Sequence, residues 1–323
     1  MNKKKIYSGL LKLIGLIVFL YIILNIDFKL FIKEFSAINI PYLLIAFALM
    51  LGVIVAKSLR WRSILKSLNI KIDQFLSLRL FWLGTYVGII TPGKIGEIVK
   101  AYFLKARGHD PLKSIFSIIA DRILDIIILL LIGFFVAIFY LTVLKNYIII
   151  LGSIPILLIV LFFLVFNEKG IFYRLIDKFL KNSLGKKFDN YNISLRGFWQ
   201  EIKNIKLKYL VETLFYLILS WFLYFFSLYL IAQSLHIRIS PILTVATTTA
   251  AAIVSMLPIS IAGLGTRDAT IIYIFSLISL SKESAVIFSF FILITELIAI
   301  AFGAFPYFKE LSLIKNNKLT PPL

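Results

Sequence analysis

The chain has 323 residues, of which 60% are hydrophobic and 16% are charged. Soluble domains carry roughly 45–50% apolar and ~25% charged residues, and a globule of this length cannot bury so much apolar surface in one core. The composition excludes the soluble-enzyme classes and indicates an integral membrane protein.

Lysine and arginine number 35 against 16 aspartate and glutamate residues, a formal charge of +19. The basic residues lie between apolar runs, as the positive-inside bias of membrane proteins expects, so we predict no nucleic-acid partner. The chain has no cysteine and only two histidines, which excludes disulfides, thiolate metal sites and cysteine nucleophiles. No metal-ligand spacing and no P-loop occurs, so we expect neither a metal nor a cofactor.

Six apolar stretches approach the ~20 residues that a membrane span needs. They are Tyr7–Ile26, Ile40–Ala56, Ile115–Tyr140, Tyr147–Phe166, Tyr209–Ala232 and Ala285–Phe308. The first follows three lysines but lacks the small-residue cleavage site of a signal peptide, so we interpret it as a retained anchor.

Two further apolar regions are broken in the middle. Phe81–Leu104 is interrupted at Thr91–Lys94, which leaves two arms of only ~10 residues, too short to cross. Ile242–Leu280 is interrupted by Pro258 and by Gly263–Asp268, with arms of roughly 12–16 residues. Both regions are predicted to form broken helical hairpins.

Charge predicts how these segments are oriented. Lys57–Arg79 and Lys105–Lys113 flank the first hairpin and are both basic, so both should be cytoplasmic and the hairpin should enter and return. The loop Asn167–Lys208 carries ten basic and four acidic residues and should share that side. The second hairpin has nearly neutral flanks and should enter from outside. Both termini are then cytoplasmic.

Each half of the chain thus has spans, a broken hairpin and a final span, in opposite orientations. Inverted repeats with discontinuous helices are typical of transporters. We predict an all-α polytopic protein of the cell membrane, a single domain over residues 1–323 with about six spanning helices and two re-entrant hairpins in an inverted repeat. The loop Asn167–Lys208 is either a set of amphipathic helices on anionic headgroups or a solvated loop packed on the spans. The tail Lys309–Leu323 is predicted to be disordered.

The first hairpin carries a candidate anion site. Its helix-break residues are Pro92, Gly93 and Gly96, and its charged residues are Lys94, Glu97 and Lys100. Thr91 is predicted to cap the helix that follows, so that free backbone N–H groups and Lys94 face the membrane interior and attract an anionic headgroup. The alternative is a cytoplasmic turn with surface charges.

The second hairpin follows the same logic. Its helix-break residues are Pro258, Gly263 and Gly265, and its charged residues are Arg267 and Asp268. Glycine permits a tight turn with positive φ, and Thr266 is predicted to cap the returning helix. An arginine inside an apolar region is costly and usually functional. The alternative is a structural ion pair at a turn.

Acidic residues mark two of the spans. Asp121 and Asp125 lie one helical turn apart on one face, and Asp125 lies ~15 Å into its span. Arg122 is expected to pair with Asp125. At that depth the charged residues must face a cavity or each other, and the candidate partners of the carboxylates are Lys94, Lys100 or Arg267. The alternative is a purely structural salt-bridge network.

Two other charged positions have simpler interpretations. Glu296 is the single acid in its span and is predicted to pair with Arg267 or to contact a substrate. The segment Arg60–Arg62 ends a span and is interpreted as an interfacial anchor, since arginine can extend its charged end to water.

Three motifs together resemble a known family. They are Gly88–Tyr102, Asp121–Asp125, and Leu257–Ser260 followed by Gly263–Asp268. They resemble, over nearly the whole chain, the transmembrane region of lysylphosphatidylglycerol synthases and the stand-alone flippase-like membrane proteins built from it. The family often has arginine where this chain has Lys94 and Lys100, and glutamate where it has Asp268. These exchanges keep the charge, but lysine lacks the bidentate fork of arginine.

The resemblance implies the translocating part without the soluble aminoacyl-transferase domain of the synthases. It implies a non-enzymatic, flippase-type transporter that moves a phospholipid or an isoprenoid-linked lipid between leaflets. Its partners are expected to be lipids with anionic headgroups and a lipid-synthesising or glycosyl-transferring enzyme. The alternatives are a membrane-embedded enzyme that modifies a lipid headgroup, with Asp121 or Asp125 as base, and a non-catalytic partner of such an enzyme.

These expectations combine into one hypothesis about the site. Lys94 and Arg267 are predicted to line one polar cavity, in which a lipid phosphate passes from one hairpin to the other. Glu97, Asp121 and Asp125 are predicted to pair with these two cations when the site is empty.

Overall fold

The computed structural model describes residues 15, 17–140, 205–255, 260 and 263–315, and within them every element is helical. This confirms the all-α class. The elements are α2 (Phe28–Ser36), α3 (Ile40–Ser67), α4 (Gln74–Ile90), η1 (Pro92–Ile98), α5 (Val99–Lys105), α6 (Pro111–Tyr140), α11 (Leu207–Ser234), α12 (Pro241–Ser255), α13 (Thr266–Leu277), α14 (Lys282–Ala301) and α15 (Ala304–Lys315). Of these, η1 is a 3-10 helix and the others are α-helices.

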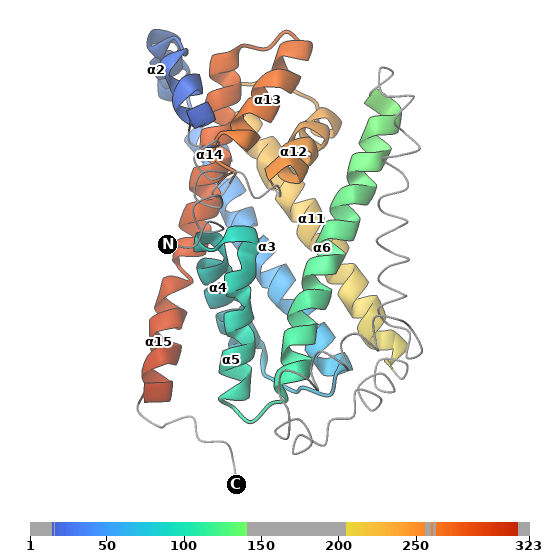
Figure 1. The fold of residues 1–323 in the computed structure, drawn as a ribbon. Coiled ribbons are helices and arrows are strands. Elements are labelled where there is room, and N and C mark those ends of the chain that lie inside the picture. Colours follow the sequence, from blue (N-terminus) through green and yellow to red (C-terminus); the bar gives the residue numbers. More distant parts are fainter. Residues whose placement is uncertain (1–14, 16, 141–204, 256–259, 261–262, 316–323) are drawn as a thin grey trace, which may run out of the picture.

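Long helices form the frame of the molecule. Among the described residues, three stretches are long and apolar enough to cross a membrane, namely α3, α11 and the continuous run Lys282–Leu313. In Figure 1, α3, α6, α11 and the pair α14–α15 run through most of the height of the molecule. Of the predicted span Tyr7–Ile26 the described part is helical up to Leu24. The predicted span Tyr147–Phe166 and nearly all of the loop Asn167–Lys208 lie outside the described residues.

Helix α3 continues well beyond its predicted end. The apolar run stops at Ala56, but the helix continues to Ser67. Trp61 and Leu65 in this added part are completely buried. The charged residues after Ala56 do not end the helix, because lysine and arginine are good helix formers and Lys57, Arg60 and Arg62 have partners inside the protein.

The first hairpin consists of α4, η1 and α5. Its outgoing arm has 17 residues and its returning arm consists of two seven-residue helices, both longer than the ~10 residues expected of the arms. The hairpin starts and finishes at the same end of the molecule, because Arg79 near the start of α4 and Arg107 just after α5 both contact the buried carboxylate of Glu310 in α15. Figure 1 shows these helices in the lower half of the molecule.

Small residues let the two arms of this hairpin pack closely. A Cβ atom on Gly84 would lie 2.6 Å from Cγ of Lys100, and one on Gly88 would lie 2.8 Å from Cγ of Glu97. The two glycines are one helical turn apart, so they form a groove along α4. The groove accommodates the stems of two charged side chains from the returning arm.

The break at the tip of the first hairpin partly follows the prediction. Thr91 is the N-cap residue and Pro92 the first residue of η1. The Thr91 hydroxyl does not cap the first turn, however; it accepts from the N–H of Gly96 at 2.7 Å and donates to the carbonyl of Gly88 at 3.0 Å. The threonine therefore ties the two arms together. Lys94 takes a positive φ of 58°, which strains a residue other than glycine.

The second hairpin consists of α12 and α13, with 15 and 12 residues, within the predicted range of arm lengths. It lies in the upper half of the molecule in Figure 1, and Pro258 lies outside the described residues. Gly265, not Thr266, is the N-cap residue of α13, with a φ of 81°. Its N–H donates to a carboxylate oxygen of Asp268 at 2.8 Å, so the aspartate closes the first turn.

The last predicted span, Ala285–Phe308, is two helices. α14 ends at Ala301, and the freed carbonyl of Ala299 accepts a hydrogen bond from Nε1 of Trp82 at 2.8 Å. A Cβ atom on Gly303 would lie 2.5 Å from the Trp82 carbonyl oxygen, so only glycine fits there. α15 then continues to Lys315. The prediction of a disordered tail is therefore wrong for residues 309–315, where Glu310 anchors the helix.

Candidate functional site: a buried charge cluster on α3, α6 and the first hairpin

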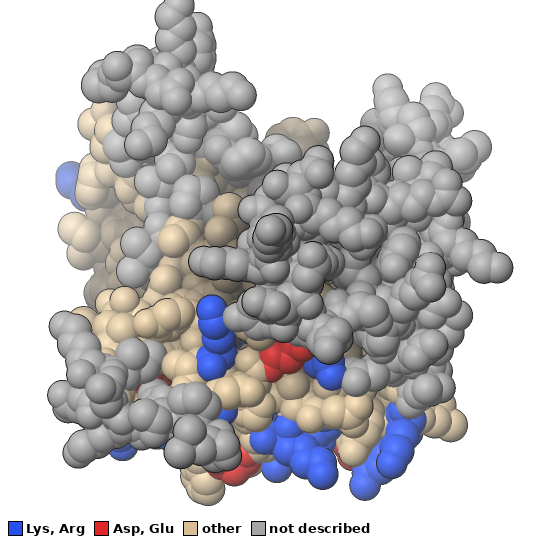
Figure 2. All heavy atoms as spheres, turned by 60° about the horizontal axis from the view of Figure 1, so that its bottom comes forward, with Lys and Arg blue, Asp and Glu red and all other residues tan. Residues whose placement is uncertain are grey.

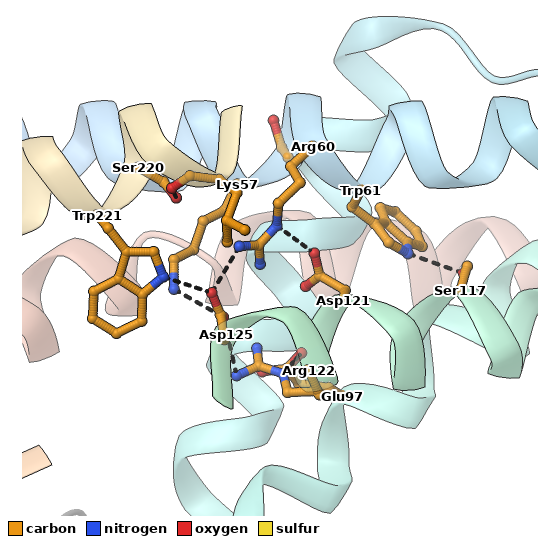
Figure 3. Close-up of polar contacts among 12 residues, drawn as sticks. Lys57, Arg60, Trp61, Glu97, Ser117, Asp121, Arg122, Asp125, Ser220 and Trp221 are labelled. Atoms are coloured by element: carbon orange, nitrogen blue, oxygen red, sulfur yellow. Dashed lines mark hydrogen bonds and ion pairs between the residues drawn. The ribbon is translucent and has the colours of Figure 1, made fainter. Parts of the chain in front are cut away.

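Arg60 of α3 joins the two acidic residues of α6. Its Nε lies 2.7 Å from Oδ1 of Asp121, and its Nη1 lies 2.7 Å from Oδ1 of Asp125 (Figure 3). Arg60 and Asp121 are completely buried. The two aspartates face α3 together because they are four residues apart on one helix.

Asp125 also joins α3 to α11. Its Oδ2 lies 3.1 Å from Nζ of Lys57, and its Oδ1 accepts a hydrogen bond of 3.2 Å from Nε1 of Trp221. Nζ of Lys57 lies 5.3 Å from the centre of the Trp221 ring, within cation–π range. Asp125 therefore connects three helices (Figure 3).

Glu97 joins the first hairpin to α6. Oε2 of Glu97 accepts from Nζ of Lys100 at 3.0 Å and from Nε of Arg122 at 3.0 Å, and Nη2 of Arg122 donates to the other oxygen. The predicted pair of Arg122 and Asp125 is also present, but at 4.0 Å. The main partner of Arg122 is thus Glu97.

Lys100 is enclosed by the protein. It is completely buried, and its Nζ lies 4.6 Å from the Phe81 ring centre and 5.0 Å from the Trp61 ring centre. Nε1 of Trp61 donates to Ser117 of α6 at 3.0 Å. Two aromatic faces and one carboxylate therefore stabilise this ammonium.

We call these residues, together with Lys94, the charge cluster. Its members are Lys57, Arg60, Lys94, Glu97, Lys100, Asp121, Arg122 and Asp125. Lys94 is exposed and makes no ion pair within the described part of the chain, yet it is close enough to interact electrostatically with Lys57 and Glu97. Two buried atoms of the cluster, Nη2 of Arg60 and Oδ2 of Asp121, have no hydrogen-bond partner.

The predicted partners of the two aspartates are wrong. Lys94, Lys100 and Arg267 were expected, whereas Arg60 and Lys57 of α3 form the ion pairs. Lys100 pairs with Glu97, and Arg267 pairs elsewhere. The interpretation of Arg60 as an interfacial anchor is therefore also wrong, because the extension of α3 places it inside the protein.

Arg267 and Asp268 form a second, smaller cluster at the start of α13. Nε of Arg267 donates to Ser289 of α14 at 2.9 Å, and the Ser289 hydroxyl donates to Asp268. Nη2 of Arg267 lies 3.7 Å from Oδ1 of Asp268 and makes no hydrogen bond. A structural ion pair at a turn is the alternative that the sequence leaves open for Arg267 and Asp268, and this arrangement matches it.

Glu296 does not pair with Arg267 as predicted. It accepts a hydrogen bond of 3.0 Å from the hydroxyl of Tyr224 in α11. The structure thus brings Glu97, Lys100, Asp121, Arg122 and Asp125 together, with Lys94 nearby, and leaves the charged residues of the second half separate. The carboxylates that were expected to hold Lys94 and Arg267 have other partners. Over the described residues, no group of acidic and histidine side chains is arranged to hold a metal ion.

Comparison with known proteins places the chain in a family. The model of the lysylphosphatidylglycerol synthase TM region matches residues 9–303. UPF0104 membrane protein MJ1595 of Methanocaldococcus jannaschii is 28% identical over 86% of this chain and 87% of its own length. UPF0104 membrane protein PH1989 of Pyrococcus horikoshii is 25% identical over 79% and 82%. No solved structure matches. The chain is therefore a multi-pass membrane protein that belongs to the family of the lysylphosphatidylglycerol synthase transmembrane region.

Proposed function

We propose that this protein is a flippase-type transporter, which moves a phospholipid or an isoprenoid-linked lipid between leaflets without catalysing a covalent reaction. The observation that supports this most is the charge cluster inside an apolar helical bundle. A charged side chain at the membrane centre costs about 2.5–3.5 kcal/mol on insertion scales. A chain that keeps eight charged residues together within a helical bundle needs them for a polar passenger or for its structure, and the surplus cations favour a passenger.

The arrangement of the hairpins supports the same proposal. We propose that both are re-entrant and belong to an inverted repeat. Figure 1 shows α4 and α5 in the lower half of the molecule and α12 and α13 in the upper half. Basic side chains gather on the lower face in Figure 2, so this face is cytoplasmic by the positive-inside rule. Broken hairpins that enter from opposite faces are typical of transporters.

The geometry favours transport over headgroup chemistry. A general base must be free to accept a proton from its substrate. Asp121 and Asp125 each already accept a hydrogen bond from the guanidinium of Arg60, and this contact holds both side chains inside the protein. A role as base for either aspartate would require this buried pair to separate first.

A transfer assay tests the proposed function. Purified protein is reconstituted into liposomes with labelled lipids, and a leaflet-selective quencher reports exchange. Asp125→Asn should slow transfer at least tenfold, because the loss of one carboxylate charge rearranges Lys57 and Arg60. Arg62→Gln is the control, since Arg62 lies on the same helix outside the cluster. Equal transfer by Asp125→Asn and the unaltered protein would contradict a transport role for the cluster.

Cysteine labelling tests the topology. In this cysteine-free chain, single cysteines at Ser67, Ala106 and Ser240 can be labelled from either side of sealed vesicles. We expect Ser67→Cys and Ala106→Cys to react from one side and Ser240→Cys from the other. Labelling of the first two from opposite sides would exclude a re-entrant first hairpin.

A further inference from the structure

The charge cluster carries more positive than negative charge. Its five cations, Lys57, Arg60, Lys94, Lys100 and Arg122, face three carboxylates, Glu97, Asp121 and Asp125, which leaves a surplus of two positive charges. For Lys57, Arg60, Glu97, Arg122 and Asp125, the strongest electrostatic influences come from other members of the same cluster. In the described part of the chain, no ion pair joins one of these cations to an acid outside the cluster.

The surplus lies on the more exposed members of the cluster. Arg60 and Lys100 are completely buried and contact all three carboxylates between them. The other cations reach outward, because the side chains of Lys57 and Arg122 are 22% and 26% exposed, and Lys94 is exposed. The cluster thus has a buried layer with a slight excess of acid and an outer layer of three cations.

The outer cations lack a sufficient counter-charge. Lys57 and Arg122 approach the same oxygen of Asp125, at 3.1 and 4.0 Å. Lys94 has no ion pair in the described structure and takes a strained positive φ. In addition, Nη2 of the buried Arg60 has no hydrogen-bond acceptor. Like charges this close in a region of low dielectric repel one another unless an anion joins them.

We infer that the outer layer of the charge cluster binds a phosphate group carrying two negative charges, as in a lipid phosphate monoester or pyrophosphate. This inference rests on the proposed function for the lipid part of the ligand. A phosphate monoester has a charge of about −1.5 to −2 at pH 7 and three acceptor oxygens, which matches three cationic donors. A phosphodiester has one negative charge, and a zwitterionic headgroup adds a cation that Lys57, Lys94 and Arg122 repel.

Binding is measured on the full chain in nanodiscs made of neutral lipid. Phosphatidic acid, phosphatidylglycerol and phosphatidylcholine with identical short acyl chains are titrated at pH 8, and the shift of the unfolding temperature gives the affinity. We expect phosphatidic acid to bind at least tenfold more tightly than phosphatidylglycerol, and phosphatidylcholine to bind weakest. Inorganic phosphate should stabilise the protein only at much higher concentration, since it lacks the acyl chains.

Lys94→Gln is the sharpest variant, because Lys94 makes no ion pair in the described structure and its removal leaves no partner uncompensated. It should weaken the binding of phosphatidic acid about tenfold and leave that of phosphatidylcholine unchanged. Lys105→Gln is the matched control, an exposed lysine at the other end of the same hairpin. It should bind all three lipids like the unaltered protein.

The outcomes separate the inference from the proposed function. Equal binding of phosphatidic acid and phosphatidylcholine, or no effect of Lys94→Gln, would overturn the inference even if lipid transfer is observed. Binding of inorganic phosphate as tight as that of phosphatidic acid would contradict the assignment of the phosphate group to a lipid. Selective binding of phosphatidic acid without any transfer between leaflets would support the inference and contradict the transport proposal.

Discussion

The two hairpins are stabilised in different ways. The first hairpin contacts its neighbours through long charged side chains, as Glu97 does with Arg122 of α6. The charges of the second hairpin pair within it, because Asp268 binds the N–H of Gly265 and the neighbouring Arg267. Their contact with α14 runs through the short hydroxyl side chain of Ser289. Its tip also packs directly on another backbone, since a Cβ atom on Gly265 would meet the carbonyl oxygen of Gly15.

The first hairpin is thus held mainly by polar contacts, and the second mainly by close packing of its tip. Long charged side chains can exchange partners, so the first hairpin can respond to an arriving anion. A tip that is fixed by backbone contacts offers no such freedom, because interiors tolerate little change in volume. We therefore expect substitutions of charge to affect the first hairpin most and substitutions of size to affect the second.

The largest effect is expected for Arg60→Met. Within the described residues, this change leaves the buried Asp121 without an ion-pair partner and removes one of three from Asp125. Removing one partner of a buried ion pair costs about 3–5 kcal/mol. The free energy of unfolding, measured by denaturant titration in detergent, should fall by about that amount.

Two variants control for this prediction. Arg62→Met, the same exchange on the same helix, removes hydrogen bonds to Ile72 and Gln74 and should cost about 1 kcal/mol. Adding Asp121→Asn to Arg60→Met should restore part of the stability, since the uncompensated charge is then gone. Additive losses in the double variant would mean that the two residues do not interact.

The second-largest loss of stability is expected when a larger side chain is introduced at the tip of the second hairpin. Gly265→Ala introduces a Cβ atom against the Gly15 backbone at a position with φ of 81°. Strain and overpacking together should cost about 2–4 kcal/mol. Gly84→Ala in the first hairpin meets the side chain of Lys100 instead and gains helix propensity, which offsets part of the overpacking, so it should cost about 1–2 kcal/mol.

Gly52→Ala is the reference for both glycine variants. Its Cβ atom would lie at an ordinary contact distance, 3.6 Å from Leu223, so the gain in helix propensity should dominate. If Gly84→Ala destabilises the protein as much as Gly265→Ala, measured by the same unfolding titration, the first hairpin is as rigid as the second.

The sequence predicts the helices and their breaks better than it predicts which charged side chains form ion pairs. The breaks near Thr91 and Gly265 and the lengths of α12 and α13 follow from glycine, proline and hydropathy, which act locally. The end of α3 does not, because hydropathy marks only the end of the apolar run at Ala56, and the lysine and arginine residues after it are good helix formers that continue the helix to Ser67. Their burial depends on the acids of α6, which are far away in the sequence.

The choice of ion pairs is the part that the sequence leaves open. Lys57 and Arg60 lie three residues apart and complement the spacing of Asp121 and Asp125 on α6, which is a signal for pairing of these helix faces. The basic residues of both hairpins offer the same charge, however. Only the packing of α3 against α6, which neither helix specifies alone, decides between them.

A smaller loss is expected for Ser289→Ala. Its buried hydroxyl accepts from Arg267 and donates to Asp268, so its removal leaves a buried guanidinium N–H without an acceptor and should cost about 2 kcal/mol. Ser227→Ala removes an equally buried hydroxyl that donates to one carbonyl, that of Ala46, and should cost about 1 kcal/mol. An equal loss in the two variants would show that the serine does not connect Arg267 and Asp268 in solution.

The smallest effect is expected for Tyr224→Phe, which removes the hydrogen bond to Glu296 and keeps the ring. The variant removes one hydrogen bond and no ion pair, so the loss should be about 1 kcal/mol. Tyr229→Phe on the same helix is the control and should be neutral, because no side-chain hydrogen bond of Tyr229 occurs in the described structure. Because Tyr224 lies outside the charge cluster, its variant should also bind phosphatidic acid normally. Weakened binding in Tyr224→Phe, with stability nearly unchanged, would instead make the second half part of the anion site and remove the distinction between the two hairpins.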